Sequence, residues 1–402
     1  MKQSSQNKNI ILFDDAARTR LLPLTFTRPI ADLRIGILTI AEKWQKLIPA
    51  NFSFKTEAYL QEKYPLILDE ANIFVNGSLI PDSEMVETIQ RLDLGQVLLK
   101  NKLLLAAKLT KNDAQNFDFK QVSQFEALQY DKEIFKLENT YDLFTQNEKA
   151  LLSDFKLITK GRTSAEISPT NNVLGKENIF LEEGVEMEFA TLNASKAPIY
   201  IGKNTLVMEG SLIRAPFALC NNSVVKMGAK IYGATTIGPF STVGGELNNC
   251  VLWGYSNKGH EGFLGNSVLG QWCNLGADTN NSNLKNTYVA VRLWNYETES
   301  FAKTGLQFCG LIMGDHSKSG INSMFNTGTV VGVAANIHGT EFPRNFIPSF
   351  ADGGYKGFKL NTLKTVFEVA ERVMQRRNIE LSQADKNILQ NVFELTQKYR
   401  KF

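Results

Sequence analysis

Histidine, the side chain best suited to take up a proton near neutral pH, is scarce in this chain. The sequence holds three, His260, His316 and His338. His260 stands in the segment Lys258-Gly-His-Glu-Gly-Phe-Leu-Gly265, and the motif Asn274-Leu-Gly-Ala277 follows it closely. No serine or cysteine nucleophile signature accompanies these motifs, so the chemistry in view is proton transfer rather than covalent catalysis.

A second group of reactive side chains lies near the N-terminus. The apolar run Asn9-Ile-Ile-Leu-Phe13 predicts a buried strand, and the loop that follows it runs from Asp14 to Pro29. A polar loop after a buried strand is the opening unit of an α/β domain that binds a ligand at the carboxyl end of the strand. The arginines of this loop are suited to the charge that develops on a phosphate group.

The stretch Thr19-Arg-Leu-Leu-Pro-Leu-Thr-Phe-Thr-Arg-Pro29 resembles the signature of sugar-1-phosphate nucleotidyltransferases, which reads Thr-Arg-Leu-x-Pro-Leu-Thr-x-x-x-Pro-Lys. The resemblance implies that Thr19, Arg20 and Arg28 contact a nucleotide. It also implies a nucleoside triphosphate as substrate and Mg²⁺ as a candidate cofactor.

The loop departs from this family at the positions that matter for phosphate binding. The family's glycines are replaced by Asp14-Asp-Ala-Ala17, its lysine by Ile30, and its metal-binding aspartate by Ser78. Two acidic side chains at this loop oppose the binding of an anionic triphosphate, and arginines compensate only in part. The sequence therefore leaves open whether this domain keeps its reaction, and also whether it serves only binding, regulation or structure.

The elements that position His260 follow from a six-residue repeat between Ile201 and Leu247. Branched aliphatic side chains occur at every sixth position, and the position four residues later is usually small. This spacing fits neither a helix nor a two-residue alternation, and it predicts a left-handed parallel β-helix of hexapeptide repeats. The eight aliphatic positions are Ile201, Val207, Ile213, Leu219, Val225, Ile231, Ile237 and Val243.

The repeat is interrupted after Gly245, and Val251, Phe263, Leu269 and Leu275 are expected to resume it in a shifted register. Three hexads give a coil of about 18 residues. The three histidines are separated by 56 and 22 residues, which disfavours a three-histidine zinc site. An aromatic excursion at 280–308 is expected to form a local core or a subunit contact, with an acyl-pocket wall as the alternative.

The motifs around His260 resemble the acetyltransferase half of the bifunctional glucosamine-1-phosphate acetyltransferase and N-acetylglucosamine-1-phosphate uridylyltransferase family. That family combines a nucleotidyltransferase domain with a β-helix, so the resemblance covers the whole architecture. It implies direct acyl transfer from acetyl-CoA or another acyl-CoA, with His260 as general base and backbone amides near Ala277 holding the thioester carbonyl. The substrate-binding positions that it implies are Lys258, Phe263, Asn274 and Asn283.

Two departures concern the acceptor. The family has a tyrosine at the position of Phe263, and an arginine-containing segment that this chain lacks, so that Lys258 is the nearest cation. The acceptor sugar, the nucleotide and the length of the acyl chain are therefore not fixed by the sequence.

The composition describes an ordinary globular protein. The 402 residues are 43% hydrophobic and 21% charged, and the net charge is +3. Such a balance implies neither a nucleic-acid footprint nor a polybasic membrane patch. The four scattered cysteines are expected to be small core residues in a reducing compartment. With no signal-peptide pattern and no membrane-span pattern, we expect a cytoplasmic protein.

We expect three parts: an α/β nucleotidyltransferase-like (Rossmann-like) domain at 1–160, a β-helix acyltransferase domain at 173–350, and a C-terminal helical cap at 351–402. The leading prediction is acyl-CoA-dependent transfer to a sugar phosphate in nucleotide-sugar biosynthesis for the cell envelope, by a homotrimer with sites between subunits. One alternative is a nucleotidyltransferase whose β-helix serves only trimerisation. Another is a non-catalytic trimeric scaffold or regulator that binds sugar nucleotides.

Overall fold

The computed structural model describes residues 8–119 and 121–402. They form two compact units. The first unit comprises residues 8–21, Arg28–Leu33 and Leu38–Glu138. The second comprises Leu22–Thr27, Arg34–Ile37 and Asn139–Phe402. Two short pieces of the N-terminal region, one of them within the loop Asp14–Pro29, thus belong to the second unit.

The first unit is built on a mixed sheet of six strands in the order β2-β1-β3-β5-β4-β6. Besides the strand at Asn9–Phe13, apolar runs in the sequence predict strands at Leu66–Leu68, Ile73–Val75 and Val97–Leu99. The first, third and fourth of these predictions are confirmed as β1, β3 and β4, whereas the strand at Leu66–Leu68 is wrong because this segment is irregular. The strands are β1 (Lys8–Phe13), β2 (Ala50–Lys55), β3 (Ala71–Asn76), β4 (Gln96–Lys100), β5 (Leu103–Thr110) and β6 (Glu126–Gln129). The helices are α1 (Ala17–Arg20), α2 (Ile40–Leu47), α3 (Ser83–Gln90) and α4 (Lys111–Gln115), with 3₁₀ turns η1 (Ile30–Asp32) and η2 (Ala58–Leu60).

In the sequence, Leu33, Ile37, Ile40, Trp44, Leu47 and Ile48 recur at a helical spacing and predict a helix from Leu33. The helix begins only at Ile40. Gly36 has a φ of +71°, which interrupts a right-handed helix. The Thr39 side chain then accepts from the backbone N–H of Glu42, and the Glu42 side chain accepts from that of Thr39. This capping box fixes the start of α2, and Thr-x-x-Glu is the sequence signal that the apolar pattern masked.

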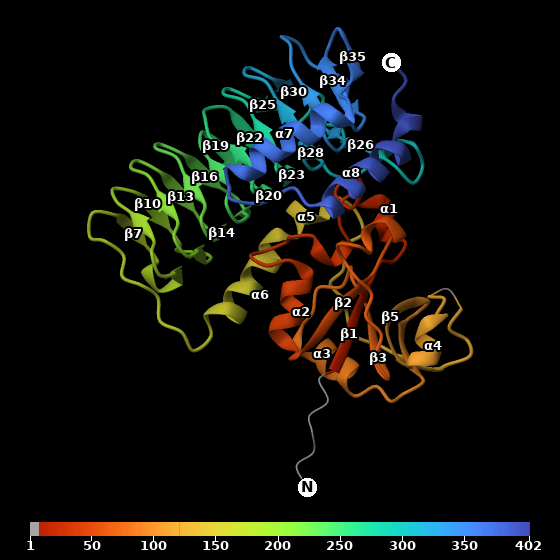
Figure 1. Cartoon of the computed structure of the whole chain (residues 1–402). Helices are drawn as coiled ribbons and strands as arrows, with labels where there is room; N and C mark the ends of the chain where they lie inside the picture. The colour runs from red at the N-terminus through yellow and green to blue at the C-terminus, as the bar shows by residue number, and fades with distance from the viewer. Residues whose placement is uncertain (1–7, 120) are drawn as a thin grey trace. The chain divides into compact units, whose positions relative to one another are not determined.

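The second unit is the expected left-handed parallel β-helix, a three-sided prism (Figure 1). Its first face carries β7 (Asn172–Leu174), β10 (Thr191–Asn193), β13 (Leu212–Arg214), β16 (Lys230–Tyr232), β19 (Glu246–Asn248) and β22 (Phe263–Gly265). Its second face carries β8 (Ile179–Leu181), β11 (Ile199–Ile201), β14 (Phe217–Leu219), β17 (Thr235–Ile237), β20 (Val251–Gly254), β23 (Val268–Gln271), β28 (Leu311–Met313), β31 (Thr329–Val331) and β33 (Phe346–Ile347).

The third face carries the strands that position the candidate site. They are β9 (Glu186–Met187), β12 (Leu206–Val207), β15 (Val224–Val225), β18 (Thr242–Val243), β21 (Asn257–Lys258), β24 (Asn274–Leu275), β29 (Lys318–Ser319), β32 (Asn336–Ile337), β34 (Ala351–Gly354) and β35 (Gly357–Leu360). All pairings of this face are parallel except the last, between β34 and β35. Two further strands, β25 (Asn280–Asn281) and β30 (Met324–Phe325), pair separately.

The core of the prism confirms the hexad prediction, because all eight predicted aliphatic positions are buried in one hydrophobic cluster. The shifted register is partly wrong. Leu252 and Leu264 point inward where Val251 and Phe263 were expected, while Leu269 and Leu275 fill the core as predicted. The irregular corners after Gly245 shorten the spacing, and this moves the inward position by one residue.

Two helices follow the prism, as expected: α7 (Leu363–Gln375) and α8 (Gln383–Leu395), the latter capped by Ser382. The apolar side of α7 packs against Trp272 on the flank of the prism, and β35 pairs with the last long strand, β34. Figure 1 shows α7 lying along the stack of strands. Before the prism lie α5 (Asp142–Thr145) and α6 (Asn147–Thr159), and η3 (Lys176–Asn178) and η4 (Gln397–Tyr399) complete the helical segments.

The aromatic excursion forms a small core of its own, the first of the two roles expected for it. The hairpin of β26 (Arg292–Asn295) and β27 (Ser300–Lys303) brings Trp294 into a stack with Phe346, with ring centroids 4.1 Å apart. Tyr296 contacts both Phe346 and Tyr399 edge to face.

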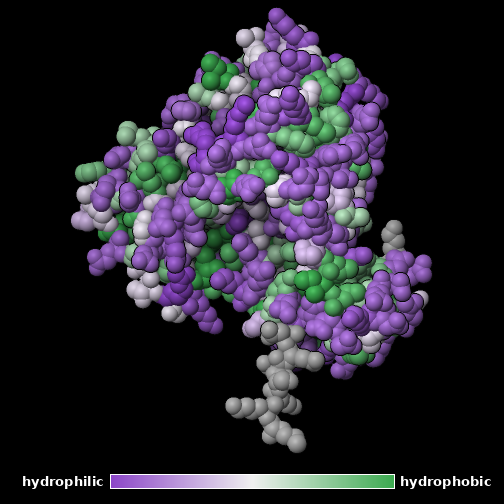
Figure 2. Space-filling model, in the orientation of Figure 1, coloured by the Kyte–Doolittle hydropathy of each residue, from purple (hydrophilic) through white to green (hydrophobic). Residues whose placement is uncertain are grey.

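All four cysteines are free and buried, as expected of core residues. Figure 2 shows hydrophilic residues over most of the visible surface, interrupted by apolar patches. Within residues 8–119 and 121–402, no helix is long and apolar enough to cross a membrane.

Candidate functional site

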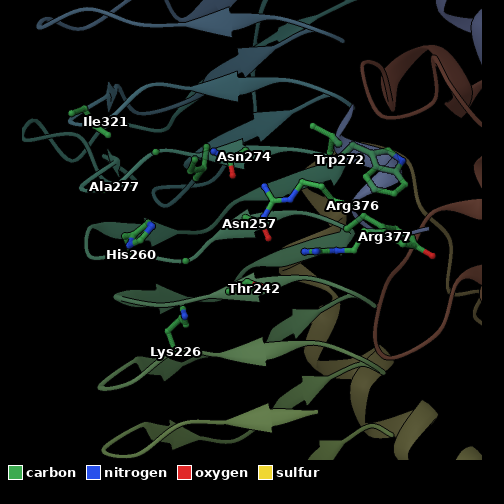
Figure 3. A pocket seen from close by; sticks show the side chains of 15 residues that line it. Lys226, Thr242, Asn257, His260, Trp272, Asn274, Ala277, Ile321, Arg376 and Arg377 are labelled. Atoms are coloured by element: carbon green, nitrogen blue, oxygen red, sulfur yellow. The ribbon is translucent and has the colours of Figure 1, made fainter. Parts of the chain in front are cut away.

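A groove of about 610 Å³ crosses the third face of the prism (Figure 3). Strands β18, β21 and β24 form its floor, and the carboxyl end of α7 forms one side. The residues that line it are Lys226, Thr242, Tyr255, Asn257, Gly259, His260, Trp272, Asn274, Leu275, Gly276, Ala277, Ile321, Val373, Arg376 and Arg377. Three predicted site residues, His260, Asn274 and Ala277, therefore meet in one cavity.

Stacking of the coils explains how these residues meet. Asn257 of β21 lies in register with Asn274 of β24, so their side chains are neighbours on the outer side of the face. His260 follows at the next corner of the same coil and is exposed. At the corner of the next coil, a Cβ on Gly276 would come within 2.4 Å of the backbone of Gly320. Only glycine fits there, and it leaves the backbone of the corner open to the groove.

The backbone at this corner offers a donor to a ligand. Gly276 and Asp278 donate their N–H groups to Ser319 and Glu261 of adjacent coils. In the described part of the chain, the N–H of Ala277 between them has no acceptor. A half-buried free amide beside an exposed histidine is the arrangement that a developing oxyanion needs.

The electrostatic character of the groove is positive. Among the described residues that line it, the charged ones are Lys226, Arg376 and Arg377, and none is acidic. Lys226 lies two strands below β21, yet its Cβ is beside Gly244, which in turn abuts Gly259. Figure 3 shows Lys226 on the same side of the groove as His260 and below it. The groove favours an anionic ligand.

Lys258 does not reach the groove. It takes the inward position that Val243 occupies one coil earlier, and it is 1% exposed. Its ammonium donates to the backbone oxygens of Gly244 at 3.0 Å and of His260 at 2.6 Å. Burial lowers the pKa of Lys258 to about 8. Lys258 thus holds the His260 corner from inside the prism and is not placed to bind substrate.

Phe263 and Asn283 lie around the corner from the groove. Phe263 opens β22 on the first face, and its ring and the Asn283 amide both lie close to Gly265. The Asn283 amide donates to the Asn266 side chain at 2.8 Å. The structure brings these two predicted residues to each other but not to His260.

In the first unit, the predicted nucleotide-binding residues point to different environments. Thr19 is exposed on α1. Arg20 donates to the backbone oxygen of Glu138 at 3.2 Å and pairs with its carboxylate. Arg28 is 2% exposed and lies 3.6 Å from the Asp32 carboxylate. Two of the three are therefore engaged by acidic groups of the chain itself.

The two loop aspartates take the donors that a phosphate loop would offer to a nucleotide. The Asp14 carboxylate accepts from the Arg18 guanidinium and from the Ile30 backbone N–H, both at 2.7 Å. The Asp15 carboxylate accepts from the Ala17 N–H at 3.0 Å and lies 3.1 Å from the Lys136 ammonium. Burial raises the pKa of Asp14 although Arg18 opposes the shift.

The residues at the family's metal position do not fit Mg²⁺. Ser78 is fully buried and donates to the Asn76 side chain at 2.6 Å, and the Asn76 amide donates to Asp15 at 3.0 Å. The Asp15 carboxylate is thus held by the Asn76 amide and the Lys136 ammonium, whereas Mg²⁺ requires free oxygen ligands. Across residues 8–119 and 121–402, no three histidine, cysteine or acidic side chains gather as a metal site.

Sequence reasoning missed several residues of the groove. The sequence could have indicated Asn257, because the shifted register of the repeat places it opposite Asn274. Arg376 and Arg377 carry no local signal, since they reach the groove only through the long return of α7 along the prism. Tyr255 and Trp272 occupy corners with a positive φ, a position where the hexad pattern does not predict aromatic residues.

Comparison with known proteins adds one decisive observation on the first domain. Residues 10–163 match the model of the sugar nucleotidyl transferase family. The match places this segment in a family of transferases, as the loop Thr19–Pro29 predicts. No curated protein matches the sequence. Among solved structures, a UDP-N-acetylglucosamine acyltransferase from Campylobacter jejuni is similar over 57% of this chain and 96% of its own, with 15% identity and a TM-score of 0.24.

Proposed function

We propose that the groove on the third face transfers an acyl group from acetyl-CoA or another acyl-CoA to an amine of a sugar phosphate. The observation that carries the proposal is the single cavity that holds His260, Asn274 and the free amide of Ala277. The charged residues in its lining are all basic, which supports phosphate-bearing substrates because acidic residues would repel them.

The reaction follows from the roles of these groups. The amine nitrogen attacks the thioester carbonyl carbon while His260 takes a proton from the amine. The Ala277 N–H stabilises the oxyanion of the tetrahedral intermediate. The carbon–sulfur bond then breaks, and the proton passes from His260 to the CoA thiolate. Asn274 orients the acceptor, and Lys226 neutralises its phosphate from the His260 side of the groove.

The test is acyl transfer from acetyl-CoA to glucosamine 1-phosphate, followed by release of free thiol. Replacing His260 by glutamine removes the base, and we expect kcat to fall about 100-fold or more. His338→Gln is the matched control, because His338 is also exposed but bonds to Asp352 outside the groove. Transfer that survives His260→Gln would contradict the proposed base.

Nucleotidyl transfer by the first domain is the second candidate, and the family match at 10–163 favours it. Its chemistry requires a triphosphate with Mg²⁺ at a loop where Asp14 and Asp15 already take the cations and amides. Release of pyrophosphate from nucleoside triphosphates with sugar 1-phosphates and Mg²⁺ is the measurement. If none of the four nucleoside triphosphates gives pyrophosphate release, this candidate is rejected and the β-helix remains as the catalytic part.

The assembly and setting belong to the same proposal. A homotrimer would set the first face, with Phe263 and Asn283, against the groove of a neighbouring chain, which gives these residues a role that one chain does not. Acyl-CoA and sugar phosphates are cytoplasmic metabolites, which supports a cytoplasmic protein that supplies nucleotide sugars for envelope glycans. The molar mass of the protein in solution, measured by light scattering, tests the trimer.

A further inference from the structure

The end of α7 brings two arginines to the side of the groove opposite His260. Figure 3 shows Arg376 and Arg377 beside Trp272, extending toward Asn257, with His260 at the far side. Met374, one turn before them, is buried against Trp272. This apolar contact fixes the end of the helix on the prism, so the two guanidinium groups are held at the groove rather than left to move with a free tail.

A helix end attracts cations in any case, because the helix dipole is negative there. Arg372 on the same helix is exposed, and its guanidinium lies 3.7 Å from the carboxylate of Glu368, so its charge is paired within the chain. In the described part of the chain, Arg376 and Arg377 have no acidic side chain within ion-pair distance. Both line the groove, and their charge is available to a ligand.

The width of the groove separates these arginines from the base by a definite length. From Tyr255 at the aromatic side to His260 the chain advances five residues, so the two positions are at most about 16 Å apart. The pantetheine arm of CoA has a dozen chain atoms between sulfur and diphosphate, as many as four amino-acid residues, and spans about 14 Å when extended. A CoA thioester at His260 is therefore long enough to bring its diphosphate to the side of the groove that holds Arg376 and Arg377.

The aromatic side excludes recognition of a base by stacking. The ring of Tyr255 is covered on one side by Phe240 at 4.9 Å and on the other by Trp272 at 4.3 Å, both stacked. No nucleobase can therefore insert between these stacked rings. The charged groups on this side of the groove are Arg376 and Arg377, which suit the phosphates of a ligand.

We propose that Arg376 and Arg377 form a diphosphate subsite, so that the C-terminal helix is part of the substrate site. The proposal rests on the groove of the proposed function, but not on the role of His260. A diphosphate reaches the subsite as part of CoA or as part of a nucleotide sugar. Paired guanidinium groups suit it because each presents a fork of donors to the phosphate oxygens.

The experiment is calorimetric titration of the full chain with CoA, UDP-N-acetylglucosamine and 4′-phosphopantetheine, the last of which lacks the diphosphate. The variants are Arg376→Ala, the double variant with Arg377→Ala, and Arg372→Ala as control on the same helix. Loss of two charge-assisted contacts is expected to weaken diphosphate binding about 10- to 100-fold in the double variant. Arg376→Ala alone, at an exposed position, is expected to give a partial loss with unchanged thermal unfolding.

Each outcome decides the proposal. A loss confined to CoA, or confined to the nucleotide sugar, supports the subsite and names its ligand. Equal affinity of the double variant and the wild type for both diphosphates overturns it, as does binding of 4′-phosphopantetheine as tightly as CoA together with unchanged binding of the nucleotide sugar by the double variant. Binding that depends on the arginines while no acyl transfer occurs would leave the subsite in place and reject the proposed function alone.

Discussion

Replacing Lys258 by methionine is expected to give a protein about as stable as the wild type near neutral pH and clearly less stable than the wild type at alkaline pH. In the wild type an ammonium is buried at an inward position of the prism where other coils carry aliphatic side chains. Its pKa falls from 10.5 to about 8, which corresponds to about 3 kcal/mol. Below pH 8 the lysine is protonated in both states, and the full cost of burying the charge is present.

Between pH 8 and 10.5 the folded protein releases this proton before the unfolded chain does, so the wild type gains stability as the pH rises. Methionine removes the charge but leaves the oxygens of Gly244 and His260 without their donor, at about 1–3 kcal/mol each. Near pH 7 the stability gained by removing the buried charge and the stability lost at the two unpaired oxygens roughly cancel. By pH 10.5 the difference in free energy of unfolding shifts by about 3 kcal/mol in favour of the wild type.

The measurement is urea unfolding of both proteins at several pH values, with Lys196→Met as the exposed control. A difference that stays constant from pH 7 to 10.5 would show that the Lys258 ammonium is not buried. Because this ammonium holds the His260 carbonyl, the methionine variant is also expected to lose at least tenfold in kcat for the proposed acyl transfer. A purely structural lysine would change the stability and leave kcat intact.

Lys258 also shows why the sequence predicts the scaffold better than the site. The hexad core depends on a local period, and eight regular positions between Ile201 and Val243 are enough to fix which side chains point inward. After Gly245 the corners vary in length, and one residue of shift exchanges Val251 for Leu252. The same shift turns Lys258 from an expected ligand contact into an inward-pointing residue.

The residues of the groove fall into two groups, those placed by the repeat and those placed by tertiary packing. His260, Asn274 and Ala277 meet because stacked coils bring equivalent corners together, and this follows from the repeat. Arg376 and Arg377 arrive from more than 100 residues further along the chain, through packing of Met374 on Trp272. No period in the sequence records that contact. The sequence therefore predicts the part of the groove made by the prism, and the part made by α7 requires the tertiary structure.

Replacing Arg18 by methionine is expected to destabilise the first unit by about 3–5 kcal/mol, the usual effect of leaving one member of a buried ion pair alone. The side chains of Arg18 and Asp14 are 9% and 7% exposed and lie 2.7 Å apart. Without Arg18, the Asp14 carboxylate keeps only the Ile30 N–H and the Thr56 hydroxyl. Urea unfolding followed by the fluorescence of Trp44, which is buried in this unit, measures the loss.

Two comparisons separate the charge from the packing. Arg91→Met removes an exposed pair with Glu87 and is expected to cost no more than about 0.5 kcal/mol. Adding Asp14→Asn to Arg18→Met removes the unpaired charge, so the double variant is expected to be more stable than Arg18→Met alone.

The pH dependence has a definite sign. Burial already raises the pKa of Asp14, so the cost of its ionised form is present above that pKa and disappears as the pH falls through it. The difference in free energy of unfolding between Arg18→Met and the double variant should therefore shrink toward acidic pH, because only the single variant carries a carboxylate at position 14. A difference independent of pH would mean that Asp14 is not a buried anion and does not take the place of a bound phosphate.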